Sequence, residues 1–283
     1  MVERGPVGFV LAELLVALVV AAIIGVALTQ LVVSQSRFVA LESGVLQARG
    51  GARAALNVMA ADLRMVSDSG LLGATPESVT VREPYAFGVA CAQSSGSTVV
   101  GLLPADSASY FSASIGGYAW RDSTGAYVFV EPASVTNASA SLGWCGGASP
   151  PITIVSAAGW PARAVRVAPN DLRTPAGAVV YLYQSVRYAF APSAQLPGRI
   201  GLWRSVISAG GGTRDELVAP FDSSAGFQFL DSVYAPHAAP PADLTTVKGL
   251  RLMLIATSEQ PPEGHVGLMV FNLTTDVVFR NHP

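Results

Sequence analysis

Residues 9–33 read FVLAELLVALVVAAIIGVALTQLVV, and this run determines what we expect of the whole chain. Of its 25 residues 21 are apolar, and the exceptions are Glu13, Gly25, Thr29 and Gln30. A helix of this length extends about 37 Å at ~1.5 Å per residue, enough to cross a hydrocarbon core of ~30 Å. A removable signal peptide is the alternative, but its apolar region normally covers only ~7–15 residues. The run therefore favours a membrane-spanning helix that stays in the protein.

The remaining composition is that of a folded, weakly charged protein. The chain has 283 residues, of which 51% are hydrophobic and only 13% charged, and its mean hydropathy is +0.44. Seventeen basic residues oppose 19 acidic ones, giving a net charge of −2. These charges form neither a basic patch for nucleic acid nor a polybasic lipid-binding segment. We therefore expect no nucleic-acid partner.

Glu13 is the only ionisable residue between Phe9 and Ser36. A carboxylate inside a membrane helix costs several kcal/mol, so we expect it to be paired, protonated or close to the interface. The segment holds no Lys or Arg that could pair with it. A free α-amino group would supply the missing cation if the chain were cut just before Phe9. Glu13 thus points to removal of a short N-terminal peptide.

Residues 8–18, GFVLAELLVAL, resemble the prepilin-type cleavage and methylation motif of type IV pilins and type II secretion pseudopilins. In that family a leader ends in Gly, the mature chain begins with Phe or Met, and Glu stands at the fifth mature position. A cut between Gly8 and Phe9 makes Glu13 the fifth residue. The basic residue that often precedes the Gly is missing here, and Arg4 is the nearest cation.

The resemblance implies a life cycle and a set of partners. A prepilin peptidase removes residues 1–8 and N-methylates Phe9, and the new ammonium of one subunit neutralises Glu13 of a neighbour. The partners implied are other minor and major pilins or pseudopilins and the inner-membrane assembly platform. The chain would span the inner (cytoplasmic) membrane once, with its globular domain in the periplasm or outside, and then enter a pilus or pseudopilus. It would be a structural subunit with no cofactor and no catalytic residue.

The helical period continues beyond the membrane run, and Ser67-Asp68-Ser69-Gly70 predicts its end. We expect a leader at 1–8, a transmembrane half of the helix at 9–36 and an amphipathic half at 37–66. An anchor followed by a separate core helix stays open, because two consecutive glycines at 50 and 51 favour a bend or break. The predicted apolar stripe consists of Phe38, Leu41, Val45, Ala52, Leu56, Met59, Leu63 and Val66.

From residue 71 to 283 the chain reads as strands and loops, so the fold class expected is α+β. A pilin-like antiparallel sheet would pack on the C-terminal half of the helix. Exposed loops are expected at 235–242 and 260–264, which are rich in proline. The predicted strands are 78–82, 98–103, 127–130, 152–155, 164–167, 178–190, 201–207, 227–233, 249–257 and 265–273.

Later motifs resemble, in their order, PilW-like minor pilins and J-class minor pseudopilins of type II secretion systems. A minor subunit is favoured because Gln30 occupies the position where many major pilins carry a kinking proline. The subunit would belong to the filament tip or the complex that primes assembly. The motifs are Ala60-Ala61-Asp62-Leu63-Arg64-Met65, Tyr181-Leu182-Tyr183, Gly201-Leu202-Trp203-Arg204, Glu216-Leu217-Val218 and Gly226-Phe227-Gln228-Phe229.

Other chemistry has weaker signals. Cys91 and Cys145 are the only cysteines, and an oxidising compartment favours a disulfide between them, although two buried thiols stay open. The three histidines are scattered and no CxxC exists, so we expect no metal site. The sequence holds no catalytic motif in a suitable context. A membrane-anchored binding module or enzyme remains the alternative from another class.

Overall fold

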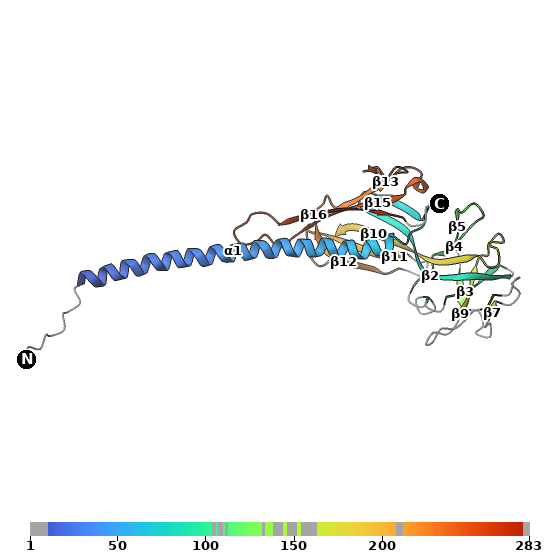
Figure 1. Ribbon diagram of the computed structural model, residues 1–283, viewed down its shortest axis with the longest axis horizontal. Helices are drawn as coiled ribbons and strands as arrows, with labels where there is room; N and C mark the ends of the chain where they lie inside the picture. The colour runs from blue at the N-terminus through green and yellow to red at the C-terminus, as the bar shows by residue number, and fades with distance from the viewer. Residues whose placement is uncertain are drawn as a thin grey trace, which may run out of the picture.

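The computed structural model describes residues 11–94, 96–103, 106, 110, 113–131, 134–137, 144–145, 152–153, 163–207 and 212–279. It consists of one long helix and a β-sheet domain gathered around the helix's C-terminal half (Figure 1). The N-terminal half of the helix extends away from the sheet with no other element beside it. The predicted α+β class and the single long apolar helix are therefore confirmed.

The helix α1 is continuous over Leu11–Leu63, 53 residues. The two glycines at 50 and 51 do not interrupt it, so the alternative of an anchor and a separate core helix is wrong. Its predicted end at Val66 is also wrong by three residues, because the chain tightens after Leu63. Val66 N donates to Leu63 O at 3.2 Å, an i→i+3 turn, and Ser69 adopts a positive φ of 62°.

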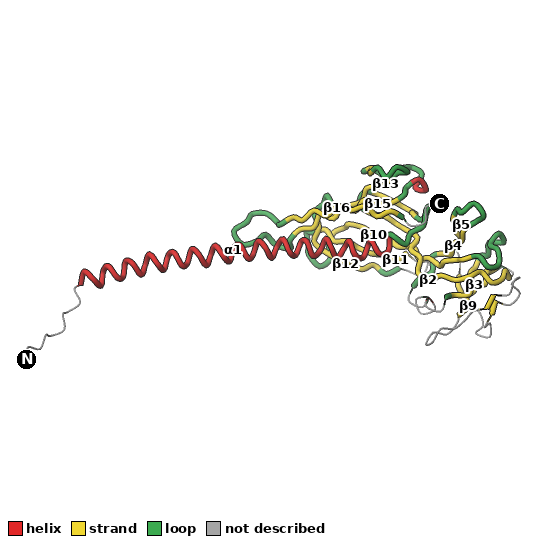
Figure 2. Tube along the Cα trace, in the orientation of Figure 1, coloured by secondary structure: helices red, strands yellow, loops and turns green. Residues whose placement is uncertain are grey.

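The strands follow the helix in a nearly unbroken series (Figure 2). A short 3₁₀ helix, η1, covers Leu244–Thr246. The strand bounds are β1 Leu71–Thr75, β2 Ser78–Ser94, β3 Ser97–Leu102, β4 Gly117–Arg121, β5 Tyr127–Val130, β6 Ser134–Asn137, β7 Trp144–Cys145, β8 Ile152–Thr153, β9 Arg163–Ala168, β10 Val179–Pro192, β11 Ile200–Ile207, β12 Arg214–Phe221, β13 Gly226–Leu230, β14 Pro236–His237, β15 Gly249–Thr257 and β16 Val270–Val278.

Fourteen of the described strands form one sheet, organised about the long antiparallel ladder of β2 and β10. One end of the ladder continues through β11, β12, β15 and β16 and carries the core that faces the helix. The other end adds β3, β4, β5, β6 and β9 around a second core. We call these the helix-proximal lobe and the distal lobe. The ladder is irregular between them, where Tyr85 is the extra residue of a bulge beside Pro84.

The helix contacts β15, β16 and β12 through its smallest residues. Gly44, Ala48, Ala52 and Ala55 are buried at steps of four and three, which places them on one helix face. This ridge lets the helix lie close to the sheet: a Cβ added to Gly44 would lie 3.1 Å from Met269 Cγ.

The predicted apolar stripe is thus only partly correct. Its C-terminal members, Ala52, Met59, Leu63 and Val66, are fully buried, and Leu41 and Leu56 are half-buried. Phe38 and Val45 are exposed, because the helix there presents Gly44 and Ala48 to the β-domain instead.

Strand prediction succeeded where consecutive residues are mostly apolar. The predicted strands 127–130 and 249–257 match β5 and β15 to the residue. Strands β1, β4, β6, β7, β12 and β14 were not predicted. The predicted strand 265–273 begins too early, because His265 N donates to Pro262 O in a turn, and β16 starts at Val270. Predicted strand 152–155 extends beyond β8 into residues that lie outside the described part.

Candidate functional site: the exposed helix and its seat on the sheet

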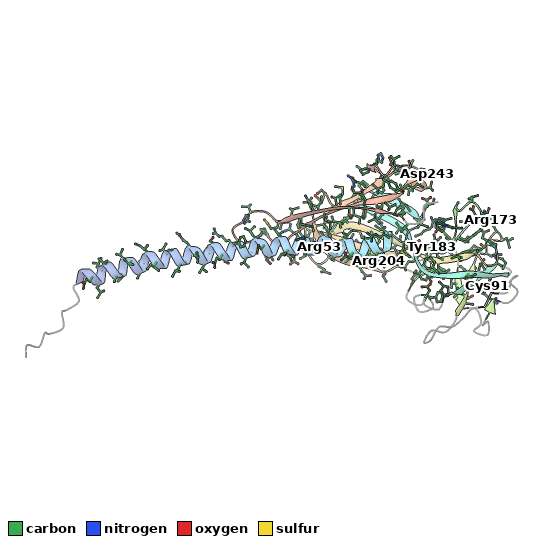
Figure 3. All side chains as sticks on the ribbon, viewed as in Figure 1. Arg53, Cys91, Arg173, Tyr183, Arg204 and Asp243 are labelled. Carbon is green, nitrogen blue, oxygen red and sulfur yellow. The ribbon has the colours of Figure 1, made fainter. Side chains whose placement is uncertain are left out.

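The apolar half of α1 has nothing packed against it within the described part of the chain. The large apolar side chains from Leu14 to Val33 are each 41–64% exposed. Figure 3 shows them standing away from the helix on all sides. The described structure contains one helix that is long and apolar enough to cross a membrane. Exposed apolar surfaces of this extent are typical of contacts with a membrane or with other proteins.

Glu13 is the one ionisable residue on this exposed half, and its side chain is exposed in the first turn of the described helix. It shares a shallow surface with Val16, Ala17, Val20, Ala21 and Ile24, all on the same side of the helix. No ion pair with Glu13 occurs among the residues that the structure describes. The predicted processing residues Gly8 and Phe9 lie outside those residues, so their roles stay predictions.

The other end of the helix is fixed by a network of charged and hydroxyl groups. Arg204 Nε donates to Asp62 Oδ2 at 3.4 Å and to Tyr188 Oη at 3.1 Å, and its Nη2 donates to Glu83 Oε2 at 2.6 Å. Tyr188 also donates a hydrogen bond to Asp62. Gln184 Nε2 completes the network with a 3.3 Å bond to Glu83. Figure 3 places Arg204 beside the C-terminal end of α1.

The network contains one cation and two carboxylates, and most of it is removed from water. Burial, with a smaller contribution from the Asp62 charge, raises the pKa of Glu83 above its usual value of 4.5, although Arg204 opposes the shift. Burial and the same Asp62 carboxylate raise the pKa of Tyr188, which therefore stays a neutral donor. The arrangement links the helix to β2, β10 and β11, so the exposed half of α1 projects from a firmly held base.

A second ionic contact holds the segment that directly follows the helix. Lys248 Nζ donates to both oxygens of Asp68, at 3.0 and 3.2 Å, and so joins the segment just after the helix to the start of β15. Asp62 and Arg204 lie in two of the motifs quoted from the sequence, but their contact was not predicted, and Lys248 was not singled out. Sequence spacing offers little signal for them, since Asp62 and Arg204 are 142 residues apart.

The cysteine prediction is tested only in part. Cys91, in the distal lobe, is fully buried and disulfide-bonded. Cys145, the one other cysteine of the sequence, lies in β7, and its side chain is outside the described residues. The Cys91–Cys145 pair therefore stays a prediction.

The described residues offer no arrangement for metal chemistry: no group of three or more His, Cys, Asp or Glu side chains among them could hold an ion. His237 Nε2 lies 2.8 Å from Asp231 Oδ2 at the surface, in a hairpin remote from the helix. Comparison with protein-family models, with curated proteins and with solved structures finds no match for this chain. The candidate site is therefore argued from the sequence and the structure alone.

Proposed function

We propose that the chain is a minor subunit of a type IV filament, a minor pilin or pseudopilin, which waits in the membrane and then joins the filament through its exposed helix. One observation carries this proposal: an apolar helical half with a single carboxylate continues without a break into a half that is packed on a β-domain. If the helix were only a membrane anchor, its apolar run would be explained, but the presence of Glu13 within that run would not.

In this proposal Glu13 sets the axial position of one subunit's helix along that of its neighbour. When apolar helices pack side by side, apolar contacts change little as one helix slides along another. A carboxylate that must meet a neighbour's N-terminal ammonium makes one register much better than the slipped ones, because an unpaired charge in an apolar surrounding is costly. The prepilin-type motif at Gly8 and Phe9 supplies that ammonium through cleavage and N-methylation.

The place in the cell follows from the same proposal. The helix spans the inner membrane once, and the β-domain lies on the periplasmic or outer side. Prepilin peptidase, the assembly platform and other pilins are the partners. A J-class pseudopilin of a type II secretion system shares every one of these features, and the neighbouring genes distinguish the two systems.

The proposal is tested by replacing Glu13. Glu13→Val should leave membrane insertion and cleavage intact, since it removes a costly group and lies five residues beyond the cut. Copurification with partner pilins and the number of filaments should both fall. Glu13→Asp, which keeps the charge but shortens the side chain, should show a partial defect.

Thr29→Val is a matched control on the same exposed half, because it also replaces a polar side chain by an apolar one. Among the described residues, Thr29 Oγ1 bonds to Gly25 O of its own helix. This variant should assemble normally. Normal assembly of a cleaved Glu13→Val protein would contradict the register role.

A further inference from the structure

The loop between β15 and β16, residues 258–269, is the part of the β-domain that reaches furthest toward the apolar half of the helix (Figures 1 and 2). Its contacts follow the helix in order. Glu259 N donates to Gln47 Oε1 at 3.3 Å, and Pro262 is buried against Gly44. At its far end, a Cβ added to Gly264 would lie 3.1 Å from Arg37 Nε.

Arg37 marks the edge of the expected membrane span. The apolar run of residues 9–33 ends at Val33, and its last 20 residues, from Leu14, are enough to cover about 30 Å, the thickness of a hydrocarbon core. Arg37 lies four residues, about one helical turn, beyond Val33. That distance places its guanidinium among the lipid headgroups, where long basic side chains normally lie. The loop tip beside Arg37 is therefore at the same level.

The loop tip is built to meet an apolar surface. Val266 is fully exposed, at 103% of its reference area, and it follows two residues after Gly264, the loop residue beside Arg37. Two basic and two acidic side chains belong to the loop or to residues that contact it: Arg37 and Arg199, and Glu259 and Glu263; His265 directly precedes Val266. A neutral surround with one protruding aliphatic side chain suits insertion between headgroups rather than binding of an anion.

We propose that the β15–β16 loop rests on the outer leaflet of the membrane and inserts Val266 among the lipid headgroups. The occupant of this surface is a phospholipid bilayer. Because a single helix would let the β-domain tilt relative to the bilayer, this second contact limits that tilt. The inference rests on the membrane anchoring in the proposed function but not on filament assembly.

The test uses the full chain in phosphatidylcholine vesicles that contain spin-labelled lipids. Val266→Cys carries an environment-sensitive fluorophore, and Val233→Cys is the matched control, since Val233 is also exposed, at 76%, in a turn after β13. Val20→Cys reports the membrane span itself, through lipids that carry the spin label within their acyl chains. Headgroup-level spin labels should quench the fluorophore at 266 at least about twofold more than that at 233, and high salt should not abolish the difference.

The three labels distinguish the possible failures. Quenching at 20 together with equal quenching at 266 and 233 would overturn the loop contact while leaving the anchor intact. Absence of quenching at 20 would overturn the membrane anchor and the loop contact together.

Discussion

Arg204 is the residue on which the seat of the helix depends, because it is the one cation between two carboxylates in the described network. The side chains of Asp62, Glu83 and Arg204 are only 22%, 12% and 24% exposed. Removing a cation from such a setting leaves like charges facing each other with little water to screen them.

Arg204→Met should therefore destabilise the β-domain by about 3 kcal/mol, which for a domain of this size lowers the melting temperature by roughly 6–12 °C. Thermal unfolding of the detergent-solubilised chain measures the effect. Arg187→Met is the control, because Arg187 is exposed on the other face of β10. Equal melting temperatures for the two variants would show that the network does not hold the helix.

The raised pKa of Glu83 predicts a pH dependence of its own. Below pH 4.5, the usual pKa of a glutamate, the side chain is protonated in both the folded and the unfolded state. Folding then buries no charge at this position. As the pH rises through the folded-state pKa, the buried charge disfavours the folded state, so the stability that the neutral form gave is lost.

Glu83→Gln removes this titration. The difference in melting temperature, variant minus parent, should increase as the pH rises above about 4.5 and should level off once the folded-state pKa of Glu83 is passed. A difference that stays constant over that range would show that Arg204 compensates the Glu83 charge completely.

At the scale of elements, the small-residue ridge sets the distance between α1 and the sheet. Ala52→Leu adds a large side chain at a fully buried position and should destabilise the domain by about 1–3 kcal/mol. Ala54→Leu places the same side chain two residues away on the exposed side of the helix and should be nearly neutral. Thermal unfolding compares them, and similar losses would contradict close packing through Ala52.

How far the sequence predicts these elements depends on the range of the interactions. The helix and β15 are specified by long local apolar patterns, and both were predicted. Strand β12, RDELVAPF, was not predicted because its first residues are charged and exposed, although the strand pairs with β11. The contacts of the Arg204 network could not be predicted from the sequence, since they depend on the order of β2, β10 and β11 in the sheet and on the packing of α1, which carries Asp62, against it.

The ridge of small residues was open to prediction. Gly44, Ala48, Ala52 and Ala55 repeat at helical spacing. Attention to the largest apolar residues led instead to Phe38 and Val45, which are exposed. In the candidate site itself, the sequence singled out Glu13 but not the firmly held base that supports its helix.

At the scale of the whole molecule, a disulfide in the distal lobe fits a domain on the oxidising side of a membrane. If Cys91 pairs with Cys145, the protein recovered from the cell envelope should show no free thiol under denaturing, non-reducing conditions. The pair closes a loop of about 54 residues and should add roughly 3–4 kcal/mol. Two titratable thiols in that protein would contradict the pairing.

The central claim is that this chain is processed and assembled as a filament subunit, and the mass of its mature N-terminus tests that claim most directly. In cells with an active prepilin peptidase, the purified protein should lack residues 1–8 and begin with N-methylated Phe9. Loss of Gly8-Phe9 cleavage in a Gly8→Ala variant is the matched control for the site. A mature chain that still begins at Met1 in such cells, or at a residue other than Phe9, would contradict the account.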